Sequence, residues 1–202
     1  MTGRLNGQVP LKAAILIGGR SSRMGAPKHL LLRPDGITFL EGAIKALVEI
    51  SKEIALVGDG EVPDEFVSFP RLSDIAAGRG PLGGILAALQ SDPACAWLIL
   101  PCDMPLVARE CLDELIEKRN PARLATVFLP SASPRPLPFP AVYEPAALEP
   151  LCAGFPNDGS VLRILGMERL EIISIQDSTP FMDFDTPEEL VQLDRLFARN
   201  GM

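Results

Sequence analysis

The chain has 202 residues, of which 47% are hydrophobic and 22% are charged, and this composition is typical of one globular domain with a full core. Its net charge of −7, from 26 acidic and 19 basic residues, disfavours binding to nucleic acid by phosphate neutralisation. It has one histidine and four cysteines, and no two cysteines have C-x-x-C spacing, which argues against a zinc site and a histidine-dependent catalytic triad.

Residues 1–202 are therefore expected to form a single domain, with residues 1–10 as a loose tail. The amino terminus has no apolar signal core, and no apolar stretch approaches the length of a membrane span. We expect a cytoplasmic protein with reduced thiols that has neither a membrane nor a nucleic acid as its partner.

Along the first 120 residues, apolar runs typical of strands alternate with segments whose apolar residues recur at helical spacing. The predicted strands are 13–17, 54–57 and 96–100, and the predicted helices are 39–51, 80–90 and 109–119. This alternation predicts an α/β fold with a mostly parallel sheet and helices on both faces.

The rest of the chain is less regular. The pattern predicts strands at 125–129, 141–143 and 170–175, and a helix at 186–198. Prolines between 130 and 140 exclude a continuous central strand there. The last helix has clear start signals, with Thr186 as the N-cap, Pro187 at the first helical position and two glutamates in the first turn.

The stretch 16–28, which reads LIGGRSSRMGAPK, follows the first predicted strand. Its glycines, among them Gly18 and Gly19, permit backbone conformations that a Cβ forbids, so bare N–H groups there could face an anion. Three cations lie in the same loop, namely Arg20, Arg23 and Lys28. The loop lacks the Gly-Lys-Ser/Thr ending of the P-loop and the glycine spacing of the dinucleotide fingerprint. The pattern favours a nucleotide triphosphate site, and the alternative is a glycine-rich turn with solvated arginines.

A single carboxylate, Asp103, follows the next apolar run in the stretch LILPCDMP, residues 98–105. In open α/β sheets, ligands bind beyond the carboxyl ends of the strands. A carboxylate there would repel a triphosphate unless a cation bridged the two, and Mg²⁺ does so with one or two carboxylates and substrate phosphates. The alternative is that Asp103 caps a turn before Pro105.

Residues 74–84 read DIAAGRGPLGG, and Gly80 and Pro81 open a predicted helix within this stretch. Glycine at that position would let a ligand approach the backbone closely. Asp74 precedes it by six residues, and a solvated loop acid is the alternative interpretation of this side chain.

Residues 181–189 read FMDFDTPEE and supply two further carboxylates. Asp183 and Asp185 alternate along the chain, so they share one face of an extended segment. We expect that face to approach a metal ion at Asp103, which would add Asp185 to the metal ligands.

These motifs resemble those of the MobA-like nucleotidyltransferases, the family of molybdenum cofactor guanylyltransferase and its relatives. The loop is similar to the family's L-A-G-G-x-S-x-R-M-G-x-D-K, with Ile17 in place of alanine and Pro27 in place of aspartate. PCDMPLV resembles the C-D-M-P-x-L motif, whose aspartate binds magnesium in the family, and Asp74 matches the aspartate that precedes G-P-L-x-G. The stretch 135–143 resembles an R-P-x-P…Y segment that borders the acceptor. The similarity extends from residue 12 to about 196.

The resemblance implies a three-layer, Rossmann-like nucleotide-diphospho-sugar transferase fold. It also implies transfer of GMP from GTP to the terminal phosphate of molybdopterin, with Mg²⁺ as the cofactor and cofactor-delivery proteins as candidate partners. The implied catalytic residues are Arg23, Lys28 and Asp103; the implied nucleotide-binding residues are Leu16, Ile17, Gly18, Gly19, Lys28, Asp74, Gly80 and Asp103; the implied metal ligands are Asp103 and Asp185; and the implied acceptor-binding residues are Arg135 and Asp183. For Arg135 a solvated side chain is the alternative.

Two features of the motifs point to different nucleotides. Gly18-Gly19 and GPLGG favour the guanylyl branch of the family, whereas the DFDTP stretch with Asp183 and Asp185 departs from the family's N-x-N-T-P and resembles its cytidylyltransferases. Cytidylyl transfer, or another NTP transfer on the same fold, is therefore the alternative activity. A non-catalytic nucleotide-binding partner in cofactor delivery is the alternative from another class, and the presence of Lys28 and Asp103 argues against it.

Overall fold

The computed structural model describes residues 9–17, 26–75, 80–155 and 160–200, except for the side chains of residues 199 and 200. Within these ranges, seven strands form one sheet in the order β3-β2-β1-β4-β6-β5-β7. The strands are β1 (Leu11–Leu16), β2 (Ile54–Val57), β3 (Arg71–Leu72), β4 (Ala96–Pro101), β5 (Ala125–Pro130), β6 (Ala141–Tyr143) and β7 (Leu170–Ile175). β6 runs antiparallel to its neighbours β4 and β5, and the other pairs are parallel, which confirms the predicted mostly parallel sheet.

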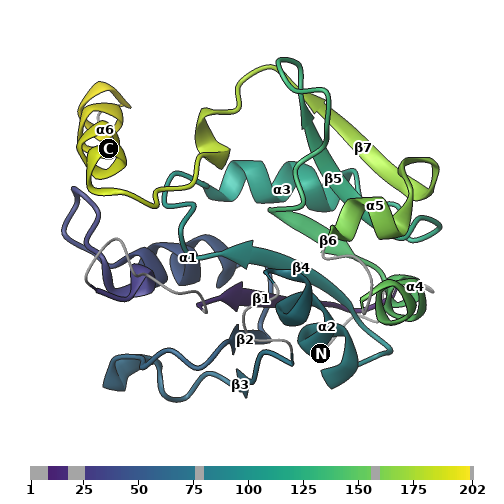
Figure 1. The fold of residues 1–202 in the computed structure, drawn as a ribbon. Helices are drawn as coiled ribbons and strands as arrows, with labels where there is room; N and C mark the ends of the chain where they lie inside the picture. Colours follow the sequence, from purple (N-terminus) through teal and green to yellow (C-terminus); the bar gives the residue numbers. More distant parts are fainter. Residues whose placement is uncertain (1–8, 18–25, 76–79, 156–159, 201–202) are drawn as a thin grey trace.

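Helices cover both faces of this sheet (Figure 1). These helices are α1 (Phe39–Leu47), α2 (Leu82–Ser91), α3 (Arg109–Glu117), α4 (Leu148–Gly154) and α5 (Val161–Leu165), and a further helix, α6 (Pro187–Asn200), lies apart from the sheet. Neighbouring side chains of a strand point to opposite faces, so β1 contributes to two cores. Ala14 belongs to the buried cluster that contains residues of α2, α4 and α5, whereas Ala13 and Ile15 belong to the cluster that contains residues of α1 and α3. The predicted three-layer arrangement is thus confirmed.

The C-terminal helix α6 belongs to a third apolar cluster and lies at one end of the molecule, above the segment that leads into α1 (Figure 1). The buried members of this cluster are Phe39, Leu106, Phe184, Leu193 and Phe197. The guanidinium of Arg33 also lies over the Phe197 ring, 5.0 Å from its centroid. Residues 31–39 and the segment before α6 are therefore held together, although they are far apart in the sequence.

Most predicted elements are present, and their ends differ by a few residues. β2, β6 and β7 have the predicted boundaries, whereas α1 ends at Leu47 rather than at residue 51. β3, α4 and α5 were not predicted. β3 has two residues, too few to display a period-two pattern, and α4 contains Pro150, which disfavours a helix in its sequence pattern.

The last two residues of the predicted tail are attached to the domain. The oxygen of Pro10 accepts a hydrogen bond from the Ala96 N–H at 2.9 Å, and that of Val9 accepts one from Arg119 at 3.1 Å. Arg119 is in turn paired with Glu144 through hydrogen bonds of 2.6 and 2.8 Å, and the Glu144 side chain is 1% exposed. The rest of that tail lies outside the described residues. Among those that are described, no helix has both the length and the apolar character needed to cross a membrane.

Candidate functional site

The carboxyl ends of four parallel strands bring together predicted site residues from the first half of the chain. β3, β2, β1 and β4 lie side by side in parallel, so these ends form one edge of the sheet. Ile17 follows β1, Asp74 lies two residues beyond β3, and Asp103 lies two residues beyond β4. This is the edge at which ligands bind in open α/β sheets.

Leu16 and Ile17 lie at this edge with their side chains packed into the domain and with backbone groups bonded to neighbouring segments. The Ile17 side chain is buried, and its N–H donates to the Val57 oxygen at 2.9 Å. The Leu16 oxygen accepts from the Cys102 N–H at 3.1 Å, and its side chain packs against α2. A Cβ at Gly84 would lie 2.8 Å from Leu16 Cδ2, so a larger residue there would require the end of the Leu16 side chain to shift.

Gly80 precedes α2 and has a positive φ of 74°, with open space where a Cβ would lie. Residues with a side chain rarely adopt this backbone conformation, so the conformation itself accounts for glycine at position 80, whether or not a ligand approaches it. The oxygen of Pro81 accepts a hydrogen bond from Ile85 N–H at 3.2 Å, so the helical turn begins at the proline.

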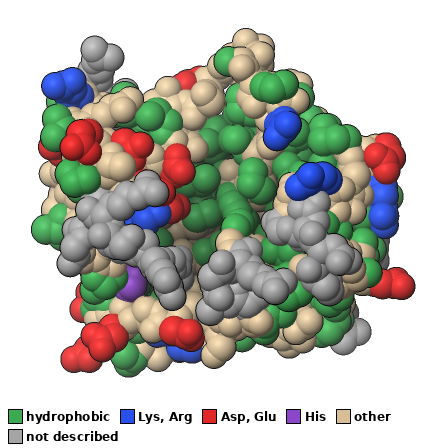
Figure 2. Space-filling view, viewed as in Figure 1, with side chains coloured by type: hydrophobic (Ala, Val, Ile, Leu, Met, Phe, Trp, Pro, Cys, Tyr) green, Lys and Arg blue, Asp and Glu red, His purple; other side chains and the backbone are tan. Residues whose placement is uncertain are grey.

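The fold joins Lys28 with two carboxylates that are distant in the sequence. Lys28 lies in a short 3₁₀ turn, Lys28–Leu30, and its ammonium donates to Asp103 Oδ2 at 3.1 Å and to Asp185 Oδ1. The partners are 75 and 157 residues away along the chain. Figure 2 shows acidic and basic side chains beside a hollow lined by apolar side chains on this face of the molecule.

The segment with Asp183 and Asp185 is anchored on both sides of the fully buried Phe184. The Phe184 N–H donates to the Asp103 backbone oxygen at 3.1 Å, which fixes this segment beside the end of β4. The start of α6 forms a capping box: Glu189 Oε2 accepts from the Asp185 and Thr186 N–H groups at 2.7 and 2.9 Å, and the Glu189 N–H donates to Thr186 Oγ1 at 3.3 Å. Asp185 is thereby held near Lys28 by its own backbone.

Burial and neighbouring charges shift the pKa values of Asp103 and Lys28. Burial raises the pKa of the Asp103 carboxyl above its usual range; Lys28 opposes this shift, and the charges of Asp185 and Asp183 add to it. Burial by itself would lower the pKa of the Lys28 ammonium, yet its hydrogen bonds and charge interactions with Asp185 and Asp103 hold that pKa above its ordinary value. Among the described residues, the Lys28 ammonium contacts the carboxylates of Asp103 and Asp185, and the charge of Asp183 acts on Asp103.

Two carboxylates that converge from different segments fit the hard oxygen donors that Mg²⁺ requires, with substrate phosphates completing its coordination. A cluster of three or more metal-ligating side chains is not present among the described residues. Asp103 and Asp185 therefore suit a metal ion that shares its ligands with a bound triphosphate.

Not every predicted site residue joins this cluster. Arg135 lies in the exposed connection between β5 and β6, where its N–H donates to Ser133 Oγ and its oxygen accepts from that hydroxyl, at 3.2 and 2.8 Å. Gly18, Gly19 and Arg23 lie outside the described residues.

Sequence reasoning did not select His29, which is 2% exposed and adjacent to Lys28. Its Nε2 lies 2.6 Å from the Glu61 oxygen, in the segment that follows β2. No local sequence pattern predicts this contact, because it joins two segments that are 32 residues apart in the chain. The capping box of Thr186 and Glu189, in contrast, could have been predicted, because threonine followed three residues later by glutamate is its sequence signature.

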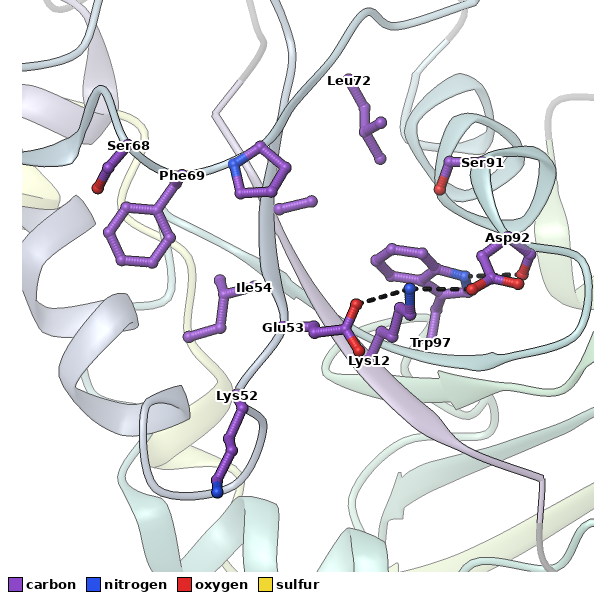
Figure 3. Close-up of a pocket in the computed structure, with 12 residues that line it drawn as sticks. Lys12, Lys52, Glu53, Ile54, Ser68, Phe69, Leu72, Ser91, Asp92 and Trp97 are labelled. Carbon is purple, nitrogen blue, oxygen red and sulfur yellow. Dashed lines mark hydrogen bonds and ion pairs between the residues drawn. The ribbon is translucent and has the colours of Figure 1, made fainter. Parts of the chain in front are cut away.

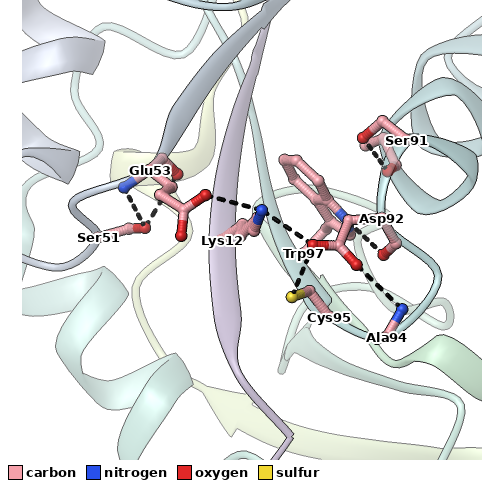
Figure 4. Close-up of polar contacts among 9 residues, drawn as sticks. Lys12, Ser51, Glu53, Ser91, Asp92, Ala94, Cys95 and Trp97 are labelled. Atoms are coloured by element: carbon pink, nitrogen blue, oxygen red, sulfur yellow. Dashed lines mark hydrogen bonds and ion pairs between the residues drawn. The ribbon is translucent and has the colours of Figure 1, made fainter. Parts of the chain in front are cut away.

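A separate cavity lies at the opposite, amino-terminal edge of the sheet (Figure 3). There, the Lys12 ammonium lies between Glu53 and Asp92, at 2.7 and 2.9 Å, and the Trp97 indole donates to the Asp92 oxygen at 3.4 Å (Figure 4). Hydrogen bonds to both carboxylates raise the Lys12 pKa above its usual value. These charges pair with one another and tie the starts of β1, β2 and β4 to the end of α2, which is a structural role.

A family model described as "MobA-like NTP transferase domain" matches residues 13–171. The chain belongs to this family. A protein of Flavobacterium johnsoniae described as "Probable molybdenum cofactor guanylyltransferase" is 32% identical to this MobA-like chain over 175 residues, which cover 85% of this chain and 88% of that protein. Nucleotidyltransferase activity and a place in molybdenum cofactor biosynthesis are thus supported by both the family and the relative.

Solved structures confirm the Rossmann-like nucleotidyltransferase fold of this MobA-like chain. Molybdopterin-guanine dinucleotide biosynthesis protein A from Archaeoglobus fulgidus superposes with a TM-score of 0.73 at 23% identity and covers 93% of this chain and 99% of its own. 2-C-methyl-D-erythritol 4-phosphate cytidylyltransferase from Thermus thermophilus has a TM-score of 0.65 at 16% identity, over 92% and 98% of the two chains. Because proteins named for different nucleotides share the fold, the fold does not decide which base is used.

Proposed function

We propose that this chain transfers GMP from GTP to the terminal phosphate of molybdopterin, with release of pyrophosphate and with Mg²⁺ as the cofactor. The observation that carries the proposal is the convergence of Lys28, Asp103 and Asp185 at the carboxyl edge of the sheet, in a member of a nucleotidyltransferase family. The relative described as a guanylyltransferase supports GTP as the donor. We place this activity in the cytoplasm.

In this reaction, an oxygen of the acceptor's terminal phosphate attacks the α-phosphorus of GTP. A bond forms between these two atoms, the bond from the α-phosphorus to the α–β bridging oxygen breaks, and its electron pair leaves with pyrophosphate. The attacking phosphate is already an anion, so the reaction needs no general base. Catalysis then depends on positioning and on stabilisation of charge.

The cluster supplies both functions. Asp103 and Asp185 would hold Mg²⁺, which when bound supplies positive charge against the α-phosphate. The Lys28 ammonium, which pairs with these carboxylates in the structure, would then turn to the β- and γ-phosphates. The remaining assignments follow the family resemblance: Leu16, Ile17, Gly18, Gly19, Asp74 and Gly80 for the nucleotide, Arg23 for catalysis, and Arg135 and Asp183 for the acceptor.

One observation favours a second candidate, cytidylyl transfer. Asp183 and Asp185 flank Phe184, where the guanylyl branch has asparagines, and the additional charge resembles that of the cytidylyltransferases. The two candidates share the metal and phosphate contacts and differ in the base that they recognise. A comparison of nucleotides therefore separates them.

The deciding experiment offers GTP, CTP, ATP and UTP to the full chain with molybdopterin, across a range of Mg²⁺ concentrations, and measures dinucleotide formation and pyrophosphate release. We expect GTP to be preferred and turnover to require the metal. A preference for CTP would replace the guanylyl assignment. Nucleotide binding without pyrophosphate release would instead support a non-catalytic partner in cofactor delivery.

A further inference from the structure

The residue beside Lys28 is a buried histidine whose contact has a defined chemistry. His29 is 2% exposed, and its Nε2 lies 2.6 Å from the backbone oxygen of Glu61. A carbonyl oxygen only accepts hydrogen bonds, so Nε2 carries the proton and donates it. Breaking this bond would leave the buried imidazole N–H without a partner, which is costly, so the bond holds the ring in place.

The loop that receives this bond is itself firmly held. A Cβ at Gly60 would lie 2.6 Å from His29 Cε1, so the imidazole packs against a position that only glycine can occupy without a shift. The guanidinium of Arg71, the first residue of β3, donates to the oxygens of Gly58 and Gly60 at 2.7 and 2.8 Å. The imidazole of His29 therefore rests on a loop that is attached to the sheet.

Lys28 and His29 lie in the same 3₁₀ turn, and their side chains point in different directions. Successive side chains of such a turn diverge by about 120°, so a buried anchor on one residue fixes the direction in which its neighbour extends. Here His29 points to the loop after β2, while Lys28 points to Asp103 and Asp185. Reactions that depend on positioning lose rate when a contact shifts by about 1 Å.

We propose that His29 is a positioning residue, which braces the turn against Gly60 and Glu61 and so directs the Lys28 ammonium toward the triphosphate. The inference rests on the phosphate-binding role of Lys28 in the proposed function. It adds a residue that touches neither substrate, and it links the phosphate site through Arg71 to β3, the strand that leads to Asp74.

The test is a double-mutant cycle with inorganic tripolyphosphate as the probe, because this ligand has neither a base nor an acceptor group. Its dissociation constant is measured by calorimetry for the full chain and for His29→Leu, Lys28→Ala and the double variant. We expect His29→Leu to weaken tripolyphosphate binding about tenfold in the wild-type background. In the Lys28→Ala background, the same substitution should change the dissociation constant by less than about twofold, since the effects of substitutions at coupled residues are not additive. His29→Gln keeps an N–H donor of similar reach and should restore most of the affinity.

Ser51→Ala is the matched control, since it also removes a buried side-chain donor to a backbone oxygen, Ser51 Oγ to Glu53 O at 3.0 Å, at the opposite edge of the sheet. It should lower the melting temperature without changing the affinity for tripolyphosphate. Equal losses from His29→Leu in both backgrounds would overturn the proposal, and so would a lowered melting temperature with unchanged affinity. Failure of the proposed guanylyl transfer is a separate result, seen as a lack of GMP transfer while the tripolyphosphate cycle remains intact. If Lys28→Ala left tripolyphosphate binding unchanged, both the phosphate role and the positioning role would be wrong.

Discussion

Replacing Lys28 by methionine should change the affinities for Mg²⁺ and for triphosphate in opposite directions. The substitution keeps most of the side-chain volume and removes the ammonium that pairs with Asp103 and Asp185. Without that ammonium, the two carboxylates lose a competing cation, so Mg²⁺ should bind more tightly to the nucleotide-free protein. The triphosphate loses a charged contact, so it should bind more weakly.

The size of the effect follows from the exposure of the three side chains, which are 20%, 23% and 40% accessible for Lys28, Asp103 and Asp185. Two unit charges about 4 Å apart interact by about 4 kcal/mol at an effective dielectric constant of about 20, which is an upper bound. A charge-assisted hydrogen bond contributes about 1.5–3 kcal/mol, and the more exposed contact with Asp185 deserves a discount for solvent. We therefore expect about 1.5–2 kcal/mol, or roughly a 10- to 30-fold gain in Mg²⁺ affinity.

The assay is calorimetric titration of Mg²⁺ into the nucleotide-free protein, and of GTP into the protein in the presence of a chelator. GTP affinity should fall by roughly tenfold or more. Lys45→Met is the control, because it removes the exposed ion pair with Glu41 on α1 and should change neither affinity. If Lys28→Met left Mg²⁺ affinity unchanged or weakened it, Asp103 and Asp185 would not be the metal ligands. An unchanged affinity for GTP would remove Lys28 from the phosphate site.

Two further predictions concern the metal ligands and the buried ion pair. Asp103→Asn should retain the fold and lose most of the transfer activity. Asp185→Asn should lose less, because the family resemblance implies that asparagine can serve at this position. Turnover at limiting Mg²⁺ checks both variants, and the reverse order would make Asp185 the main ligand. Arg119→Met should lower the free energy of unfolding by about 3–5 kcal/mol, since it leaves the Glu144 carboxylate buried and unpaired. Denaturant unfolding measures this loss, and the double variant with Glu144→Leu should recover most of it; a small loss in the single variant would show that Glu144 finds another partner.

Local signals were enough to predict much of the fold. The strands at β2 and β7 are short apolar or alternating runs bounded by turn residues, and their ends were predicted to the residue. Thr186 as the N-cap and Pro187 at the first helical position predicted the start of α6. The carboxylate of Asp103 could be assigned to the ligand-binding edge because the strand that precedes it is continuous and apolar.

Other features depend on partners that are distant along the chain. β3 is a strand because its two residues pair with β2. β6 is antiparallel because the chain reverses direction after β5 and then inserts β6 between β5 and β4. Neither the presence of β3 nor the direction of β6 could be predicted from local periodicity, since two or three residues are too few to display a period.

The sequence determined the chemical groups of the candidate site: a cation at Lys28 and carboxylates at positions 103 and 185, each in a recognisable motif. The sequence also predicted that Asp185 would approach Asp103, and the structure brings both to the Lys28 ammonium, across 75 and 157 residues. Only the tertiary structure decided that Lys28 pairs directly with these carboxylates and that the buried imidazole of His29 contacts the loop after β2. The reason is physical. Motifs express local backbone preferences, whereas the distance between two charges depends on how strands order themselves in the sheet and on which apolar faces pack together.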